Sequence, residues 1–151
     1  MSNNLSDSDI DLIKNWLNKN FLQIINETEG LHSITTDIPS EFGRSRARDL
    51  SHTNSIDVKV HENHDKSQIK LDIFSEIVII LSIHFNISDY DQSEDVRLWV
   101  GDIKKDFADY SSELETQLRT IMQITFSKTS KKILNCECKS IEGDYGSIKI
   151  N

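Results

Sequence analysis

The sequence predicts a single α+β domain over residues 1–151, with one amphipathic helix packed on an antiparallel sheet. In residues 68–87 every odd position is apolar except Ser75, which places a continuous buried face on one side of a strand. Residues 6–27 instead repeat apolar side chains every three or four positions, which is typical of a helix with one buried stripe. The connections around the strand are short, and this favours an antiparallel meander.

The N-terminal helix is expected to begin at Ser6 or Ser8, because either hydroxyl can accept from the free N–H groups of the first turn. Three aspartates between positions 7 and 11 suit the positive end of the helix dipole. Gly30 marks the expected end of this element.

Residues 28–54 show neither period and are expected to form an irregular loop, apart from a possible short strand at Leu31–Thr35. This segment holds a local basic cluster of Arg44, Arg46 and Arg48. Guanidinium groups pair with phosphates and carboxylates, so such a loop in an acidic chain can hold an anion or a carboxylate of a partner.

A β-hairpin is predicted next. Residues 56–61 alternate between apolar and polar, residues 62–67 form a polar turn, and residues 68–74 return. A bulge or break is expected at Ser75–Glu76. The strand over residues 77–87 then begins with apolar side chains on both faces, which predicts an interior position in the sheet.

A helical region is predicted after this sheet, because apolar residues recur at spacings of three and four from Val96 to Ile121. The helix is continuous or broken near Gly101 and Ser111–Ser112. A competing interpretation makes Val96–Val100 a strand and begins the helix at Asp102.

The C-terminal part is predicted to return to β-strands that form hairpins. Residues 122–126 and 133–138 alternate in the way that strands do, with a polar turn over residues 127–131 between them. Gly143 and Gly146 flank a second turn that leads into the last strand.

The net charge of −8 favours a basic protein as partner and argues against nucleic acid or an anionic membrane. The first residues lack the basic and apolar regions of a secretory signal. Cys136 and Cys138 are too close in sequence to build a disulfide framework. We therefore expect a cytoplasmic protein with reduced thiols, and the oligomeric state is left open.

Candidate catalytic and metal-binding residues each have a simpler structural interpretation. His61 and His64 have the spacing of two zinc ligands, but side chains of a hairpin turn diverge, so no metal site is expected. Cys136 and Cys138 are interpreted as small apolar strand residues, and His84 as a hydrogen-bonded structural residue. With no nucleophile, nucleotide-binding or metalloprotease motif present, we expect neither an enzyme nor a cofactor.

The acidic segment carries the most informative pattern for function. Asp89 to Glu115 contains nine acids against three bases. Four of the acids are spaced by four, three and four residues, and on a helix they form one exposed stripe: Asp102, Asp106, Asp109 and Glu113. Phe107 and Tyr110 lie at its edge. We expect these six residues to bind the partner, with electrostatic steering by the acids.

In size, acidity and lack of catalytic motifs, the chain resembles bacterial immunity proteins. The resemblance implies an antitoxin that neutralises a basic toxin, such as a nuclease, by direct binding. One alternative is a small enzyme or anion-binding domain that uses the Arg44–Arg48 loop with His61, His64 or His84 nearby. Another alternative is an acidic secretion chaperone.

Overall fold

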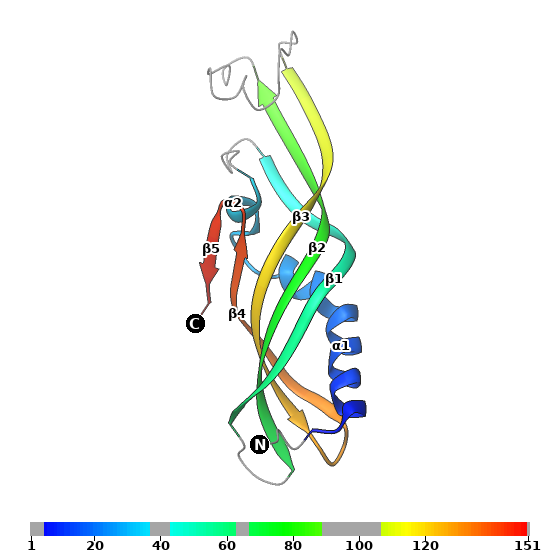
Figure 1. Ribbon diagram of the computed structural model, residues 1–151. Coiled ribbons are helices and arrows are strands. Elements are labelled where there is room, and N and C mark those ends of the chain that lie inside the picture. Colours follow the sequence, from blue (N-terminus) through cyan, green and yellow to red (C-terminus); the bar gives the residue numbers. More distant parts are fainter. Residues whose placement is uncertain (1–4, 37–42, 63–66, 89–106, 151) are drawn as a thin grey trace.

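The computed structural model describes residues 5–36, 43–62, 67–88 and 107–150, with side chains for all of these except 62, 85–88 and 107–112. It shows an α+β fold in which an N-terminal helix packs against a five-stranded antiparallel sheet of order β1-β2-β3-β4-β5 (Figure 1). The elements are α1 (Asp7–Asn26), α2 (Leu31–Thr35), β1 (Gly43–Glu62), β2 (Gln68–Ser88), β3 (Phe107–Ser127), β4 (Lys132–Gly143) and β5 (Gly146–Lys149). The predicted meander is therefore confirmed.

Helix α1 begins where the sequence predicted. The Ser6 hydroxyl accepts a hydrogen bond from the Asp9 N–H at 3.1 Å, and the Asp9 carboxylate accepts one from the Ser6 N–H at 3.4 Å. This capping box satisfies two N–H groups that have no partner inside the helix. The Asp9 carboxylate also accepts from Lys131 Nζ at 2.8 Å, which ties the start of α1 to the β3–β4 turn.

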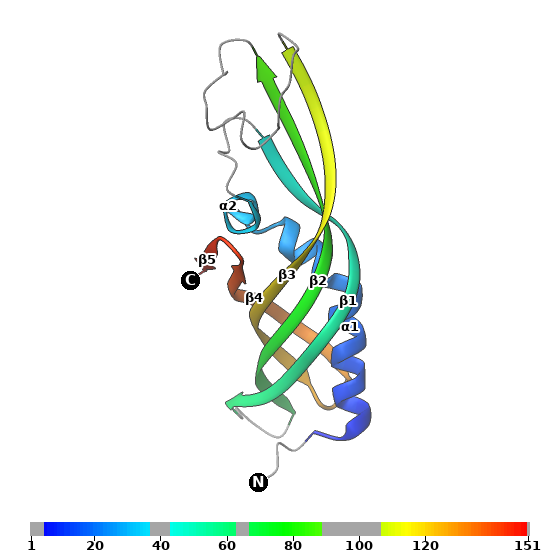
Figure 2. The ribbon, with the colours of Figure 1, turned by 45° about the horizontal axis from the view of Figure 1, so that its top comes forward.

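The core lies between α1 and the inner face of the sheet. One stripe of α1 is fully buried, and the odd residues of β2 from Ile69 to Ile83 are all buried with it. The even residues of β3 from Thr116 to Phe126 complete this inner face. Figures 1 and 2 show α1 alongside β1, while the paired ends of β2 and β3 extend beyond both helices.

Strand β2 is not broken at Ser75–Glu76, although a bulge of β1 lies opposite Glu76, where Thr53 pairs with Ile77 and Ser55 with Glu76. The pairing between β2 and β3 runs without a register shift from Gln68 to Ser88. Ser75 is buried on the inner face between Ile56 of β1 and Thr120 of β3. A small side chain at this position keeps the alternation of the strand, so it does not interrupt the pairing.

The loop predicted over residues 28–54 is also wrong, because Gly43–Glu62 is one long strand and Leu31–Thr35 is a short helix. Strand β1 has four register shifts against β2. Each shift inserts a residue and resets the alternation of side chains, so the period of two is lost from the sequence. In α2, one helical turn buries Leu31, Ile34 and Thr35 together.

The prediction of an acidic helical region is wrong over residues 107–121, because these residues belong to strand β3. Leu114 and Ile121, which a helix would have placed in the core, are 41% and 37% exposed. Thr116 and Thr120 are buried instead. Pairing along the whole length of β2 overrides the local spacing of apolar residues. The Val96–Val100 alternative lies outside the described residues.

The C-terminal hairpins match the prediction in part: both turns lie where expected, but β3 and β4 are longer than the predicted strands. The second hairpin fixes α2. The Tyr145 N–H donates to the Ile34 carbonyl at 3.1 Å. Gly143 lies so close to this helix that a Cβ atom added there would be 2.3 Å from the same carbonyl oxygen. A glycine is therefore required where the hairpin meets α2.

A side-chain amide holds α1 against the edge strand β1. Asn26 Nδ2 donates to the Ala47 carbonyl at 2.8 Å, and Asn26 Oδ1 accepts from the Ala47 N–H at 2.9 Å. Both backbone groups lie next to a register shift of β1. Among the described helices, none is both long enough and apolar enough to cross a bilayer.

The substitution Asp9→Ala should lower the free energy of unfolding at pH 7 by about 1–3 kcal/mol, because it removes the capping box and the Lys131 contact. The hydrogen bond from Lys131 lowers the pKa of Asp9 below the ordinary value of 3.8, against the opposing effect of burial. The stabilisation is therefore present above pH 3.8 and lost as the pH falls through the lower pKa of the folded state. Urea unfolding at pH 7 and pH 3 measures this. Asp11→Ala, at an exposed position of the same helix, is the control and should cost far less.

The substitution Thr120→Val should raise the free energy of unfolding by about 0.5–2 kcal/mol. The Thr120 hydroxyl is buried and has no hydrogen-bond partner in the described part of the chain. Valine has nearly the same shape and replaces this unsatisfied hydroxyl with a methyl group. The matched control is Thr35→Val, because the buried Thr35 hydroxyl donates to the Leu31 carbonyl at 2.7 Å. Thermal unfolding should shift in opposite directions for the two variants, and destabilisation by both would contradict the prediction.

Candidate functional site

The outer face of the sheet, opposite α1, contains a recess of about 310 Å³ that spans four strands. Its apolar floor is the cross-strand pair Phe74 and Ile121, each 37% exposed. Large apolar side chains that face water in adjacent strands are typical of binding surfaces, and a recess between polar walls favours a specific contact.

Carboxylates surround this floor. Asp57 comes from β1, Glu76 from β2 and Glu142 from β4. Arg119 of β3 lies between two of them, with its Nε 3.7 Å from Glu76 Oε1 and its Nη1 2.9 Å from Glu142 Oε1. Three carboxylates against one guanidinium leave the recess net negative and suited to a cationic group. We call this site the outer recess.

A lysine of β1 lies over the ring of Phe74. Lys59 Nζ is 5.2 Å from the centre of that ring, within the range of a cation–π contact. One face of the ring is therefore engaged by the chain's own cation, and with this lysine counted the three carboxylates still outnumber the two cations.

The residues predicted to form an acidic helical stripe do not form one. Asp109 and Glu113 lie in strand β3, as do Phe107 and Tyr110, whereas Asp102 and Asp106 lie outside the described residues. Asp109 and Glu113 are four residues apart, and in a strand this spacing places them on the same side of the extended chain, far further apart than one turn of a helix would.

The two charged clusters singled out from the sequence meet each other. The Arg48 guanidinium forms an ion pair with the Glu113 carboxylate, so a candidate cation and a candidate anion are engaged within the chain. In the register of β1 and β2, Arg44 lies opposite His84 and Arg46 opposite Ser82. These arginines belong to a strand, not to the predicted loop.

The histidines do not converge. His61 Nδ1 lies 2.8 Å from Asp72 Oδ2, near the end of β1 that is remote from Arg44. The predicted gathering of His61 with the arginines is therefore wrong, and His64 lies outside the described residues. In the described part of the chain, no group of three or more His, Cys, Asp or Glu residues is placed to hold a metal ion.

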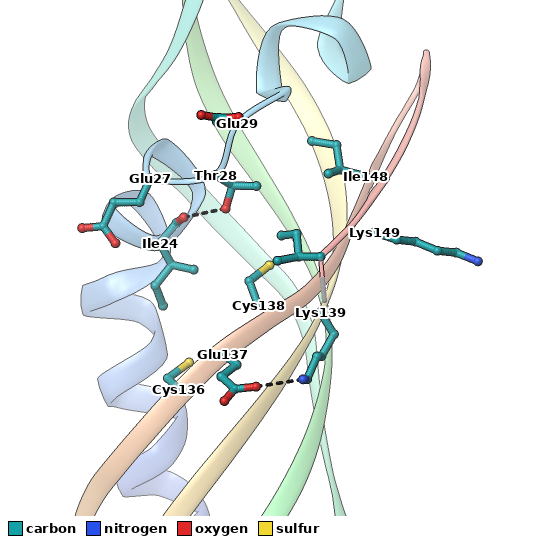
Figure 3. Close-up of a pocket in the computed structure, with 11 residues that line it drawn as sticks. Ile24, Glu27, Thr28, Glu29, Cys136, Glu137, Cys138, Lys139, Ile148 and Lys149 are labelled. Carbon is teal, nitrogen blue, oxygen red and sulfur yellow. Dashed lines mark hydrogen bonds and ion pairs between the residues drawn. The ribbon is translucent and has the colours of Figure 1, made fainter.

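A second concavity lies between the C-terminal half of α1 and strand β4. It has a volume of about 720 Å³, and Cys136 and Cys138 line it (Figure 3). Burial raises the pKa of the Cys136 thiol to about 11, helped by the neighbouring Cys138 and Glu137. Burial also raises the pKa of Cys138. Both thiols are protonated near neutral pH, which fits the interpretation as small apolar residues. We call this site the thiol groove.

Comparison with protein-family models, with curated protein sequences and with solved structures yields no match to this chain.

Sequence reasoning missed the outer recess, because Asp57, Glu76 and Glu142 come together only through the register of four strands. One signal was present in the sequence. Phe74 is a large apolar residue at an even position of a strand whose odd positions are buried, so it had to face outward.

Alkylation of Cys136 by iodoacetamide, followed by mass spectrometry in a Cys138→Ser background, should be about a hundredfold slower at pH 8 than alkylation of a thiol with the ordinary pKa of 9.0. The thiolate is the reactive form, so the rate should keep rising about tenfold per pH unit until the pH approaches 11. The same chain unfolded in urea provides the reference rate. A plateau in the folded chain near pH 9 would contradict the assignment.

Proposed function

We propose that this chain is a binding protein that neutralises a basic protein partner, in the manner of bacterial immunity proteins, and that the outer recess is the centre of the contact. The observation that carries the proposal is the recess itself. It combines an exposed apolar floor with a rim of three carboxylates, in a chain with a net charge of −8.

The geometry of the rim supports tight rather than merely non-specific attraction. Arg119 holds Glu76 and Glu142 in place through ion pairs, so these carboxylates lose little side-chain freedom when a cation arrives. Phe74 and Ile121 offer an apolar platform for the aliphatic part of a lysine or arginine side chain. Aromatic and aliphatic anchors inside a polar rim are typical of the energetic centres of interfaces.

The four acidic residues that the sequence analysis predicted to bind the partner contribute to this proposal through their electrostatic field. Asp102, Asp106, Asp109 and Glu113 add negative charge to the same chain and speed the encounter with a basic partner. Because Glu113 already pairs with Arg48, its contribution to the contact itself is smaller than that of the recess. Steering changes the association rate more than the affinity, so the two sets of acids can be distinguished kinetically.

Anion binding is a second candidate, favoured by Arg44 and Arg46 lying opposite His84 and Ser82. Guanidinium groups two residues apart on one strand have the spacing to hold one phosphate or carboxylate. This function would use the outer face near the start of β1 and would not need the outer recess.

The double reversal Glu76→Lys with Glu142→Lys should abolish retention of the partner when the full chain is used as bait in an extract of its source cells. Retained proteins are identified by mass spectrometry and then purified for kinetics. For the purified partner, we expect at least a hundredfold loss of affinity, mainly through faster dissociation, because desolvated charge pairs become repulsive. Reversal of Asp102, Asp106, Asp109 and Glu113 should mainly slow association, and the effect should fade at high salt.

The matched control is Arg44→Glu with Arg46→Glu, which leaves the outer recess intact and should retain the basic partner. If this control loses the partner while the recess variant keeps it, the anion-binding function is favoured instead. Neutralisation is then tested by expressing the retained protein with and without this chain. Toxicity that the chain does not relieve would contradict the immunity function.

A further inference from the structure

Strand β4 has an edge that is only partly paired. Strand β5 pairs with Ser140–Gly143 alone, and the Lys139 carbonyl accepts one further bond, from the Ile150 N–H at 2.8 Å. In an antiparallel strand, the N–H and C=O of one residue point to the same side and alternate from residue to residue. The Lys128 N–H donates to the Ser67 carbonyl, so even residues of β3 bond to β2 and odd residues bond to β4. Asn135 and Glu137 are the partners of two odd residues of β3 and therefore direct their backbone groups toward β3, and a register shift after Cys138 resets the alternation at Lys139. The backbone groups of Cys136 and Cys138 point to the opposite side, where no described strand pairs with them.

The thiol groove lies directly beside this edge. Its floor is apolar and comes from Ile24 of α1, Cys136 and Cys138 of β4, and Ile148 of β5. Figure 3 shows the two thiols on the side of β4 that faces α1 and Thr28. Cys136 and Cys138 are opposite the buried Ile124 and Met122 of β3, so the groove opens on the inner face of the sheet, away from the outer recess.

The helix side of the groove is acidic. Glu27 and Glu29 line it there and are both exposed. On the strand side, Lys139 Nζ is engaged with Glu137 at 2.8 Å. Lys149 of β5 also lines the groove, and Figure 3 shows its side chain extending away from Cys136 and Cys138. A cationic side chain that enters over the thiols therefore meets the two helix-side carboxylates.

We propose that the thiol groove binds an extended segment of a partner protein, which adds as a strand to the β4 edge at the backbone groups of Cys136 and Cys138. Side chains of one parity in that segment are apolar and fill the groove over Cys136 and Cys138. A lysine or arginine of the segment pairs with Glu27 and Glu29. The main chain supplies affinity, and the groove with its two acids supplies sequence preference.

A second copy of this chain is the less suitable occupant of the edge. Each copy carries a net charge of −8, so association of two copies is opposed by repulsion, whereas a basic segment is attracted. The proposal does not depend on the outer recess, which lies on the other face of the sheet.

The probe is a displayed library of random 12-residue peptides, selected on the full chain. We expect the selected peptides to alternate apolar residues with polar ones and to contain lysine or arginine. As synthetic peptides, they should slow alkylation of both Cys136 and Cys138 at least tenfold at saturation, because they cover the thiols. Selection of no peptide, or of peptides that leave both thiols equally reactive, overturns the proposal.

Backbone pairing is tested on both partners. N-methylation at alternate positions of a selected peptide should weaken binding at least tenfold for one parity and leave the other unchanged, because only alternate amides face β4. On the protein, Cys136→Pro removes an N–H that faces the edge, a position where strands tolerate proline. It should weaken binding at least tenfold relative to Cys136→Ala, which removes the same side chain but keeps the N–H.

Circular dichroism and urea unfolding establish whether Cys136→Pro is folded, and if it is not, the N-methyl series decides alone. Equal effects of N-methylation at both parities overturn strand addition.

Charge reversal locates the site. Glu27→Lys with Glu29→Lys should weaken binding of the peptide at least tenfold, whereas Glu142→Lys in the outer recess should leave it unchanged. The opposite pattern places the peptide in the outer recess and overturns the proposal. Light scattering of the free chain tests the other occupant. A dimer that Cys136→Pro dissociates, and that the peptides cannot displace, assigns the edge to a second copy and likewise overturns it.

Discussion

The structure depends on the burial of one continuous apolar face, the odd side of β2. At about 25 cal/mol per Å² of apolar area removed from water, covering such a face is the dominant favourable contribution to this fold. Helix α1 covers it from one side, and the flanking strands β1 and β3 must match its length to satisfy the backbone groups of β2. The remaining elements are arranged around that requirement. The β3–β4 turn reaches Asp9 at the start of α1, and the β4–β5 turn fixes α2.

The division of the sheet into two faces also divides the chemistry. The inner face is apolar apart from a few hydroxyl groups, whereas charged groups of the outer face largely form ion pairs across strands. Surface pairs of this kind contribute little to stability, so their main effect here is to orient side chains. Arg119 is the clearest case, since it reaches carboxylates on two neighbouring strands and leaves them aligned around Phe74. The thiol groove follows from the same division, because α1 lies on the β1 side of the inner face and leaves β4 open near its edge (Figure 1).

The periodicity of the sequence predicted α1 and β2 because each buries one uninterrupted face. It failed for β1, where four register shifts mix both parities on one side, so that Arg44, Arg46 and Arg48 were interpreted as loop residues. It also failed for β3, because Leu114, Leu118 and Ile121 happen to be spaced as in a helix although only Leu118 is buried. The outer recess could not be found from spacing at all, since its carboxylates are 19 and 66 residues apart in the chain and meet only through strand register. Local patterns report how a segment meets the core, whereas sites between strands depend on pairing that the local pattern does not encode.

The two hydrogen bonds between the Asn26 side-chain amide and the Ala47 backbone affect how copies of this chain can pair through their strands. Together with the four register shifts, these bonds occupy and distort the outer edge of β1, so that this side of the sheet is a poor template for another strand. The edge of β4 at Cys136 and Cys138 carries no such obstruction among the described strands. Stacking of copies by strand addition needs one edge that receives and another that donates, so the obstruction of β1 makes pairing of β1 with β4 of a second copy unfavourable. The obstructed edge thus lowers the risk of one mode of polymerisation while the β4 edge stays available for recognition.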